Sequence, residues 1–590
     1  MNSKRTTARL TASLAAAVFA ATAAVQTQGA WFYPQMELEI HRLGRMQSET
    51  ERTGMLAAHP GEVPEVRREI EFRRPNGDGK YETVKRTSPY RQPVGLRSDK
   101  DGWEAQTFDG VWRKCAKYAD SERPAHLVDM PEDRTIKPLK AGADGIYDFG
   151  TETLAYLECE ADAEPEFRVG ESLDELEEND PQNMEYVPRM IRVGDRRWRT
   201  PVPYAFRYFR WKTDGKTGLT CFPTSVKVVP VGRKHEKRGT FHSPNERWNR
   251  MFEVAERTLH LCSQDFLIDG IKRDRLPWAG DLAVSLMANA YIYGDAEIVR
   301  RTLSVMDAYT GDVNGIVTYS MWTIISHDLY QLYYGDRAFL EDRWWRVKWR
   351  VENLVSRCDE RGFVVKGNDW VFVDWTKEVD PSAAQMIWVG ALDAAARLAD
   401  RVGDEDAAKY RSLAAKVRRE LNAKHWDEAK GMYGVGRHAS IYAVIFDVAD
   451  AAKMKRIGAN LAKNEIAPVG TPYVYGWELI ALKRAGYVKE FFAGIEKVFG
   501  AMLDAGATTF WEGYDAKEKG AERYRFYGRP FGKSLCHVWS AWPAILFVSE
   551  VMGVKPTSDG WKTWEQKPLP GVTGLSATLP SGISFSEKQH

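Results

Sequence analysis

The sequence predicts a multidomain protein with a β-rich N-terminal region, a long helical region and a short C-terminal β segment. Three observations lead to this prediction. A chain of 590 residues exceeds the size at which a single hydrophobic core stops growing. Short alternating apolar runs dominate residues 65–230, which is typical of strands. After Ser243 a helical apolar period persists for roughly three hundred residues, and it gives way to strand-like runs after Gly553.

The composition excludes some partners. Lys and Arg number 83 and Asp and Glu 82, so the formal net charge is +1 and indicates neither nucleic acid nor an anionic membrane as a partner. Hydrophobic residues make up 44% and charged residues 28%, as in ordinary soluble proteins. The 21 Trp and 25 Tyr offer aromatic faces that suit sugar rings, although most of them are expected in the core.

Residues 1–30 are predicted to form a secretory signal peptide. Lys4, Arg5 and Arg9 give a basic start, and a short apolar run follows at Leu10–Ala24. Cleavage is expected near residues 21–23 or 29–30. The run is shorter than the roughly twenty apolar residues that span a bilayer. We therefore expect an exported protein, periplasmic or extracellular, without a membrane span in its mature form.

Residues 31–240 are predicted to form an antiparallel β-sandwich region and a linker. Strands are expected at Glu69–Phe72, Tyr204–Phe209 and Thr224–Pro230, between Gly-, Pro- and Asp-rich turns. Repeated short strands without helices between them favour a sandwich. The acidic run at residues 171–180 is expected to be an exposed loop, and the basic residues 231–239 are the expected linker.

Residues 241–552 are predicted to be helical. The first helix is expected to open at Ser243-Pro244, as cap and first-turn residue. Gly followed by Asp at 294–295, 335–336 and 403–404 is expected to end one helix and cap the next. Further helices are expected at 282–293, 296–309, 323–334, 337–358, 381–402, 405–421, 449–462, 475–485 and 487–503. Short turns between paired helices indicate stacked helical hairpins.

Residues 553–590 are predicted to add a few short strands that pack back on the helices. The six Cys are scattered without a Cys-x-x-Cys pair, so neither a zinc site nor a disulfide framework is expected. No metal and no cofactor are predicted.

One charged stretch carries the functional prediction. Residues 269–281 hold three acids, three basic residues and one indole: Asp269, Asp274, Asp281, Lys272, Arg273, Arg275 and Trp278. Gly270, Pro277 and Gly280 argue against a helix through the middle. We interpret the stretch as a loop that brings acids, cations and an indole into one hollow. The alternative is a solvated charge run between two helices.

A second stretch lies far downstream. Residues 506–512 read Gly-Ala-Thr-Thr-Phe-Trp-Glu, and Ser-Leu-Cys-His follows at 534–537. Together the two stretches resemble the α-L-rhamnosidases of glycoside hydrolase family 78. The family's first motif falls on Asp269, Arg273, Asp274, Arg275, Trp278 and Asp281, and its second ends on Glu512 and is followed by His537. The resemblance runs from about residue 145 to residue 567.

The resemblance implies a fold and a set of roles. It implies that residues 241–552 close into an (α/α)6 barrel, where the periodicity alone indicates only a mostly helical region. It makes Asp274 the general acid and Glu512 the base that activates water, which is an inverting arrangement with carboxyls about 6.5–9.5 Å apart. It gives substrate-binding roles to Asp269, Arg273, Trp278, Asp281, Trp370 and His537. The implied substrate is a terminal α-L-rhamnose of a glycoside or polysaccharide.

The sequence departs from the family at the acid. Glu is usual there, and Asp274 is one methylene shorter. Because a misplacement of about 1 Å can cost a hundredfold in rate, the change indicates a reshaped pocket or a weak enzyme unless a loop shift restores the reach. Other readings are an exo-glycosidase of this fold with another sugar specificity and a weakened homologue that only binds carbohydrate. At the level of residues, Asp274 could form a salt bridge and Glu512 could cap a helix.

Overall fold

In the computed structural model, the residues described before residue 146 are those of six strands, at 69–75, 81–87, 96–99, 102–106, 112–115 and 140–141. From residue 146 onward the described segments are 146–178, 190–200, 203–211, 224–235, 239–264, 266–272, 275–309, 311–364, 370–376, 379–463, 465–528 and 530–586. The predicted signal peptide lies outside the described residues.

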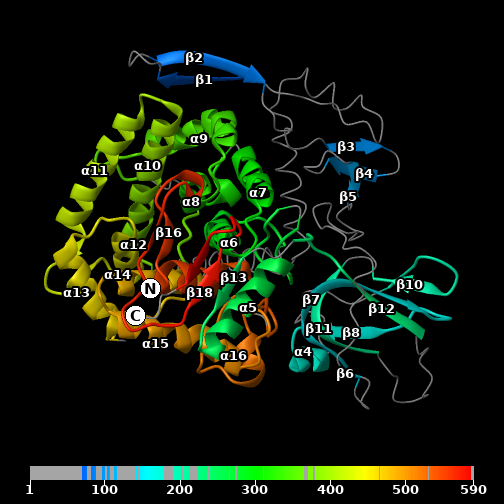
Figure 1. Cartoon of the computed structure of the whole chain (residues 1–590). Coiled ribbons are helices and arrows are strands. Elements are labelled where there is room, and N and C mark those ends of the chain that lie inside the picture. Colours follow the sequence, from blue (N-terminus) through cyan, green and yellow to red (C-terminus); the bar gives the residue numbers. More distant parts are fainter. Residues whose placement is uncertain are drawn as a thin grey trace, which may run out of the picture.

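A seven-stranded antiparallel sheet forms the main part of the N-terminal region (Figure 1). Its central strand, β7, pairs with four neighbours along its 15 residues, and the strand order is β8-β11-β7-β10-β9, with β6 and β12 also on β7. The strands are β6 (Lys140–Ala141), β7 (Ile146–Glu160), β8 (Phe167–Gly170), β9 (Ile191–Arg192), β10 (Arg197–Arg199), β11 (Tyr204–Trp211) and β12 (Thr224–Pro230). One face buries Leu157, Phe206 and Phe209. The strands expected at 204–209 and 224–230 are confirmed.

Five further strands precede this sheet. They are β1 (Glu69–Pro75) and β2 (Tyr81–Thr87), which form an antiparallel pair, and β3 (Leu96–Asp99), β4 (Gly102–Gln106) and β5 (Trp112–Cys115), which form a three-stranded sheet. The expected strand at residues 69–72 is therefore confirmed.

The acidic run at residues 171–180 is not the exposed loop that the sequence predicts. Residues Leu173–Glu177 form helix α4, and the Ser172 hydroxyl accepts a hydrogen bond from the Glu175 amide at 3.3 Å as its cap. Glu171 and Glu175 are buried, because Lys272 compensates their charge. A buried cation from a distant segment thus draws part of the run into the interior.

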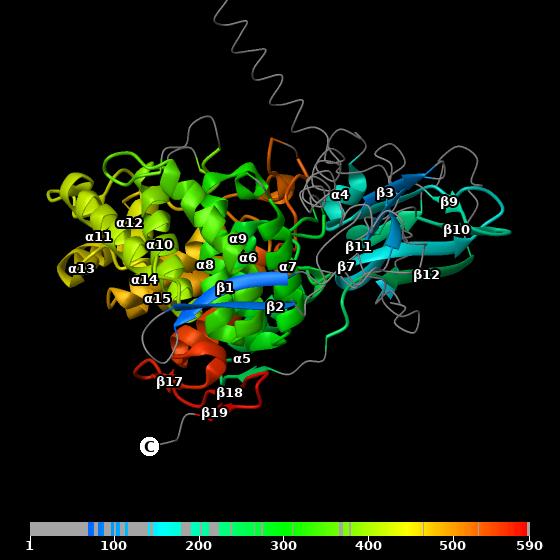
Figure 2. The same ribbon diagram turned by 90° about the horizontal axis from the view of Figure 1, so that it is seen from above.

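The helical region packs beside the sheet (Figures 1 and 2). Its α-helices are α5 (Glu246–Leu261), α6 (Ala279–Ile292), α7 (Ala296–Ala308), α8 (Val317–Tyr334), α9 (Arg337–Ser356), α10 (Ser382–Val402), α11 (Ala407–Lys424), α12 (His438–Ile445), α13 (Ala451–Ala462), α14 (Pro472–Arg484), α15 (Val488–Ile495), α16 (Ala501–Asp504) and α17 (Trp542–Ile545). Shorter helical turns are η4 (Val313–Gly315), η5 (Glu496–Gly500), η6 (Gly520–Tyr524), η7 (Val538–Ser540), η8 (Leu546–Val551) and η9 (Asp559–Trp561). A two-stranded ribbon, β14 (Trp426–Asp427) and β15 (Met432–Tyr433), lies between α11 and α12.

The helix ends follow local signals in most places. Gly294, Gly335 and Gly403 have φ of +61°, +68° and +71°, and Asp295 and Asp336 cap the next helices, as predicted. Two expectations are wrong. Asn245 rather than Ser243 caps α5, because its side chain accepts from the Arg247 amide. Asp406 rather than Asp404 occupies the N-cap position of α11; the Asp404 carboxylate accepts from the Asp406 amide at 3.0 Å, just before the helix, and also from Trp344 and Lys348.

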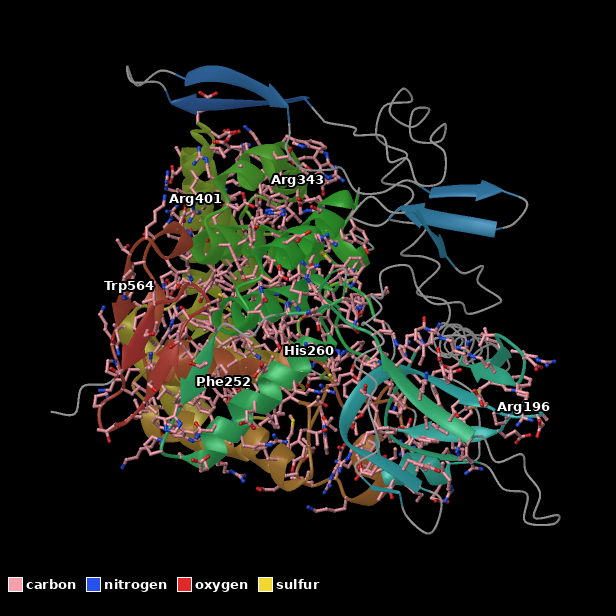
Figure 3. All side chains as sticks on the ribbon, turned by 45° about the vertical axis from the view of Figure 1, so that its right-hand side comes forward. Arg196, Phe252, His260, Arg343, Arg401 and Trp564 are labelled. Carbon is pink, nitrogen blue, oxygen red and sulfur yellow. The ribbon has the colours of Figure 1, made fainter. Side chains whose placement is uncertain are left out.

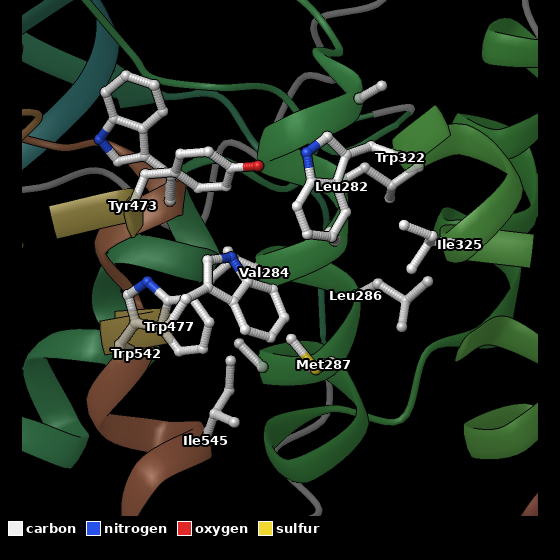
Figure 4. Packing of buried hydrophobic residues seen from close by; sticks show 14 of the residues in the cluster. Leu282, Val284, Leu286, Met287, Trp322, Ile325, Tyr473, Trp477, Trp542 and Ile545 are labelled. Carbon is white, nitrogen blue, oxygen red and sulfur yellow. The ribbon is translucent and has the colours of Figure 1, made fainter. Parts of the chain in front are cut away.

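The helical core is built on large side chains. Trp322 of α8 is 1% exposed and stacks on Trp477 of α14 at 5.5 Å between ring centroids (Figure 4). Trp477 meets Trp542 of α17 at 4.8 Å. These contacts join helices that lie far apart in the sequence, and they fix the framework from which the loops of the site project.

The C-terminal segment returns to the start of the helical region. It holds β16 (Val554–Pro556), β17 (Trp564–Gln566), β18 (Ser576–Thr578) and β19 (Ser584–Ser586), and β18 pairs with β13 (Thr240–His242) just before α5. The Arg401 guanidinium of α10 pairs with Asp559 at 2.7 Å, and Figure 3 labels Arg401 together with Trp564 of β17. The strands therefore pack on the helical region, as expected.

Candidate active site

The two charged stretches meet in space. Gly270 and His537 form an isolated antiparallel bridge. The Val538 amide donates to the Asp269 carbonyl at 2.7 Å, and the Ile271 amide donates to the Cys536 carbonyl at 3.3 Å. A Cβ atom at residue 270 would lie 3.0 Å from the Cys536 carbonyl oxygen, closer than ordinary van der Waals contact, so glycine favours this close approach. The backbone thus fixes residues 269–271 beside residues 536–538.

The described residues of the first stretch up to Trp278 form a loop held by its own hydrogen bonds, as predicted, whereas residues 279–281 begin helix α6. The Asp269 carboxylate accepts from the Leu276 amide at 3.0 Å, which closes the loop on itself. Arg275 has a φ of +55° and donates to the backbone carbonyls of Ile271 at 2.7 Å and Pro203 at 2.8 Å. Through these two hydrogen bonds Arg275 holds the loop against the segment that leads into β11.

His537 lies at the centre of three carboxylates. Its Nε2 atom is 3.8 Å from an Asp269 oxygen and 3.8 Å from a Glu512 oxygen, and its Nδ1 atom is 3.4 Å from an Asp281 oxygen. All four side chains are buried. Asp281 occupies the first turn of α6, where the helix dipole stabilises a negative charge. The imidazole separates three acids that would otherwise repel one another.

Glu512 has directed donors of its own. Its Oε2 atom accepts from the Ser534 amide at 3.0 Å, and its Oε1 atom accepts from the Tyr527 hydroxyl at 2.9 Å. The Glu512 carbonyl accepts from the Trp539 indole at 3.0 Å. Sequence reasoning missed Tyr527, and the only local signal was a run of aromatic and basic residues at 523–529. Glu512 therefore does not act as the helix cap considered above.

Aromatic side chains form a path away from the acids. Tyr527 meets Trp375 at 5.0 Å between centroids, Trp375 meets Trp370 at 5.8 Å, and Trp370 is 47% exposed. On the other side Trp278, at the start of α6, meets Tyr319 at 6.1 Å. The two predicted Trp residues therefore lie on the aromatic surroundings of the acids, and Trp375 is nearer to Glu512 than Trp370 along this path.

Arg273 and Asp274 lie outside the described residues. Their neighbours on either side, Lys272 and Arg275, are buried and bonded to the protein. The structure thus brings together four of the predicted site residues, Asp269, Asp281, Glu512 and His537, and Trp278 lies three residues before Asp281 at the start of α6.

The side chains gathered at this site suit the hydroxyl groups of a sugar. Carboxylates, an imidazole and aromatic faces can accept hydrogen bonds from a sugar and stack on its apolar side. Within the described part of the chain, no cluster of three or more His, Cys, Asp or Glu residues could hold a metal ion. Among the described residues, Cys159, Cys262, Cys358 and Cys536 form no disulfide bond. In the same described part no helix is long and apolar enough to cross a membrane.

Comparisons with known proteins show the family of the helical region. The family model described as the bacterial α-L-rhamnosidase six-hairpin glycosidase domain matches residues 236–551. A comparison with curated proteins gives no match.

Solved structures share the fold. A family 78 rhamnosidase of Bacillus sp. GL1 is 23% identical with a TM-score of 0.65, covering 77% of this chain and 52% of that chain. The Streptomyces avermitilis α-L-rhamnosidase complexed with L-rhamnose is 18% identical with a TM-score of 0.63, covering 87% and 55%. The chain thus spans about half the length of these two proteins. A Klebsiella oxytoca rhamnosidase with rhamnose bound is 25% identical with a TM-score of 0.59, covering 78% and 94%.

Proposed function

Since the chain belongs to the family of bacterial α-L-rhamnosidases with a six-hairpin glycosidase domain, we propose that it hydrolyses terminal α-L-rhamnosides. Membership confirms the resemblance that the sequence motifs carry. The observation that best supports the activity is the meeting of Asp269, Asp281 and Glu512 around His537, because the motif that contains Asp274 and the motif that contains Glu512 thereby form one site.

The family and the helix pairs support a finer description of the fold. In this proposal residues 241–552 close into an (α/α)6 barrel, and residues 31–240 contain a β-sandwich that precedes it. The loops 269–278, 370–376 and 505–540 then stand at one end of the barrel, where the acids gather.

The mechanism assigned to this site uses two carboxyl groups. Asp274 protonates the leaving glycosidic oxygen, and Glu512 removes a proton from the water that attacks the anomeric carbon on the opposite face. The Tyr527 hydroxyl and the Ser534 amide support this role, because they orient the Glu512 carboxylate. The products are the free sugar with inverted anomeric configuration and the released alcohol.

The other predicted residues recognise the sugar. Asp269, Asp281, Arg273 and His537 bind its hydroxyl groups, and Trp278 and Trp370 pack against its apolar face and C6 methyl group. No cofactor takes part in this reaction. Asp274 is one methylene shorter than the usual Glu, so in this proposal its loop approaches the glycosidic oxygen more closely.

The N-terminus supports export. A basic start, a short apolar run and small residues are what a secretory signal needs. Expression in a bacterial host followed by N-terminal sequencing tests this proposal. A mature chain that starts between residues 22 and 31 supports export, and an intact N-terminus in the cytoplasmic fraction contradicts it.

A panel of aryl glycosides tests the activity. Wild-type protein should release the aryl group from the α-L-rhamnoside, whereas Asp274→Asn and Glu512→Gln should lose nearly all activity. Release from another glycoside in place of the rhamnoside would favour an exo-glycosidase of other specificity. Sugar binding without release from any member of the panel would favour a carbohydrate-binding homologue. Full activity in either variant would refute the assigned roles.

A further inference from the structure

A buried ion cluster connects the N-terminal sheet to the site. Glu171, which follows β8, is 2% exposed, and its Oε2 atom accepts from the Leu535 amide at 2.9 Å. The same oxygen lies 3.4 Å from Lys272 Nζ. Lys272 is 3% exposed and also pairs with Glu175 of α4 at 2.8 Å. One carboxylate oxygen thus contacts two segments at once.

Both segments carry site residues. Lys272 directly precedes Arg273 and Asp274. Leu535 follows Ser534, whose amide donates to Glu512, and lies two residues before His537. Moving either contact would move one of the two proposed catalytic carboxyls relative to the other, because each is a neighbour in the chain of a residue that Glu171 holds.

We propose that Glu171 is a positioning residue for glycoside hydrolysis: its carboxylate holds the Lys272 loop and the Ser534–His537 segment at a fixed separation. This inference rests on the proposed function, and it assigns a part in the reaction to a residue of the N-terminal region. Glu175 assists by pairing with Lys272 and by accepting from the Glu171 amide at 2.9 Å.

The positioning role of Glu171 should depend on pH, because the ion pair with Lys272 requires a charged Glu171 carboxylate. Glu152 of β7, Glu175 of α4, Lys272 of the loop and the Leu535 amide face the group. Burial is the main cause that raises the pKa of Glu171 to about 7; the neighbouring Glu175 adds to the rise, and Lys272 and the Leu535 amide oppose it. Glu152 and Glu171 both line a cleft of about 260 Å³ between the sheet and the segment at 505–511. Protonation removes the attraction between Glu171 and Lys272.

Glu171→Gln tests the proposal against Glu177→Gln, a control on the exposed side of α4 where Glu177 pairs with Arg210. At pH 8 the Glu171 variant should lose about tenfold or more in kcat on an aryl α-L-rhamnoside, since an error of about 1 Å at the reacting centre costs up to a hundredfold. Its KM should stay within about threefold of the wild-type KM, because the sugar contacts remain.

The pH profile adds a readout that a merely structural residue would not move. Wild-type kcat should fall as Glu171 is protonated below about pH 7. Glu171→Gln should lack this step and match the wild-type kcat near pH 5.5, and Glu171→Asp, which keeps the charge, should recover part of the loss at pH 8. An unchanged wild-type profile in Glu171→Gln would overturn the proposal.

Hydrogen exchange by mass spectrometry decides the matter without activity. Glu171→Gln should speed the exchange of amides in both 269–278 and 534–540, while Glu177→Gln should leave both unchanged. If the wild type cleaves no rhamnoside, the proposed function fails, and the exchange data still show whether Glu171 holds the two segments. Unchanged exchange in both segments of Glu171→Gln would refute the positioning role, and Lys272→Met gives the same test from the other side of the pair if the Gln variant does not fold.

Discussion

At the scale of single residues, the site is a set of acids with different donors. Glu512 accepts from a backbone amide and from a tyrosine hydroxyl, Asp269 accepts from the Leu276 amide, and Asp281 lies at a helix N-terminus. His537 lies near all three carboxylates. Because each acid is held by a different part of the chain, each can take a separate role in one small volume.

Removing the Tyr527 hydroxyl should weaken catalysis. Tyr527→Phe deletes the donor to Glu512 Oε1, and a hydrogen bond to a charged group contributes about 1.5–3 kcal/mol. We expect kcat on an aryl α-L-rhamnoside to fall about tenfold to a hundredfold, as such a free-energy change implies. Tyr514→Phe is the matched control, since Tyr514 contacts Trp511 by its ring. Equal rates for Tyr527→Phe and wild type would contradict the role given to this hydroxyl.

At the scale of elements, the site depends on one close backbone approach. The bridge between Gly270 and His537 joins the loop before α6 to the segment before η7. A Cβ atom at residue 270 would also lie 3.2 Å from the His537 ring and 3.2 Å from the Ser534 hydroxyl. The absence of a side chain at residue 270 therefore favours the close packing of these two site segments.

Gly270→Ala should lower stability and activity together. Overpacking in a well-packed interior costs about 1–3 kcal/mol, so the free energy of unfolding should fall by that amount. The displaced His537 segment should also lower kcat. Gly311→Ala is the control, because no atom lies within 4 Å of a Cβ placed there. Wild-type urea unfolding and kcat in Gly270→Ala would show that the close approach is not required.

The elements also show what sequence patterns can predict. Strands β11 and β12 and the turns at Gly294 and Gly335 were predictable, because alternation and Gly-Asp pairs act over a few residues. Helix α12 was missed, because all eight of its residues are buried and it shows no polar face.

At the site, too, contacts between residues far apart in the chain limit what the sequence can predict. The two motifs located Asp269, Asp281, Glu512 and His537 correctly as neighbours. Glu171 was predicted to be exposed, because nothing in its own run indicates that it accepts a hydrogen bond from Leu535, 364 positions away. Tyr527 was missed for the same reason, since its contact with Glu512 depends on the fold of the intervening loop.

At the scale of the whole molecule, the N-terminal region and the helical region share a buried set of charges, made by Glu171, Glu175 and Lys272. Burial and the neighbouring Glu171 raise the pKa of Glu152 well above its ordinary value, and burial raises the pKa of Glu171 to about 7. Burying the charge of a carboxylate lowers the stability of the protein. Such buried carboxyls with raised pKa values are typical of functional sites, where the position of a side chain matters more than its contribution to stability.

This cluster should make stability depend on pH. The folded state binds more protons than the unfolded state between the ordinary carboxyl pKa of 4.5 and about 7, so the free energy of unfolding should fall as pH rises through that window. For Glu171 the fall is on the order of 3 kcal/mol. Glu171→Gln should therefore show a smaller drop in the urea midpoint between pH 5 and pH 8 than Glu177→Gln or wild type. An equal drop in all three proteins would show that Glu171 does not titrate in this window.

The central claim is that the two motifs form one site for inverting hydrolysis of α-L-rhamnosides. Proton NMR of the sugar first released from an aryl α-L-rhamnoside tests it most directly, with Asp274→Asn and Glu512→Gln as companions. We expect β-L-rhamnose to accumulate before mutarotation, and we expect no release by either variant. Initial formation of α-L-rhamnose, or β-L-rhamnose formed at the wild-type rate by the Glu512 variant, would contradict the account.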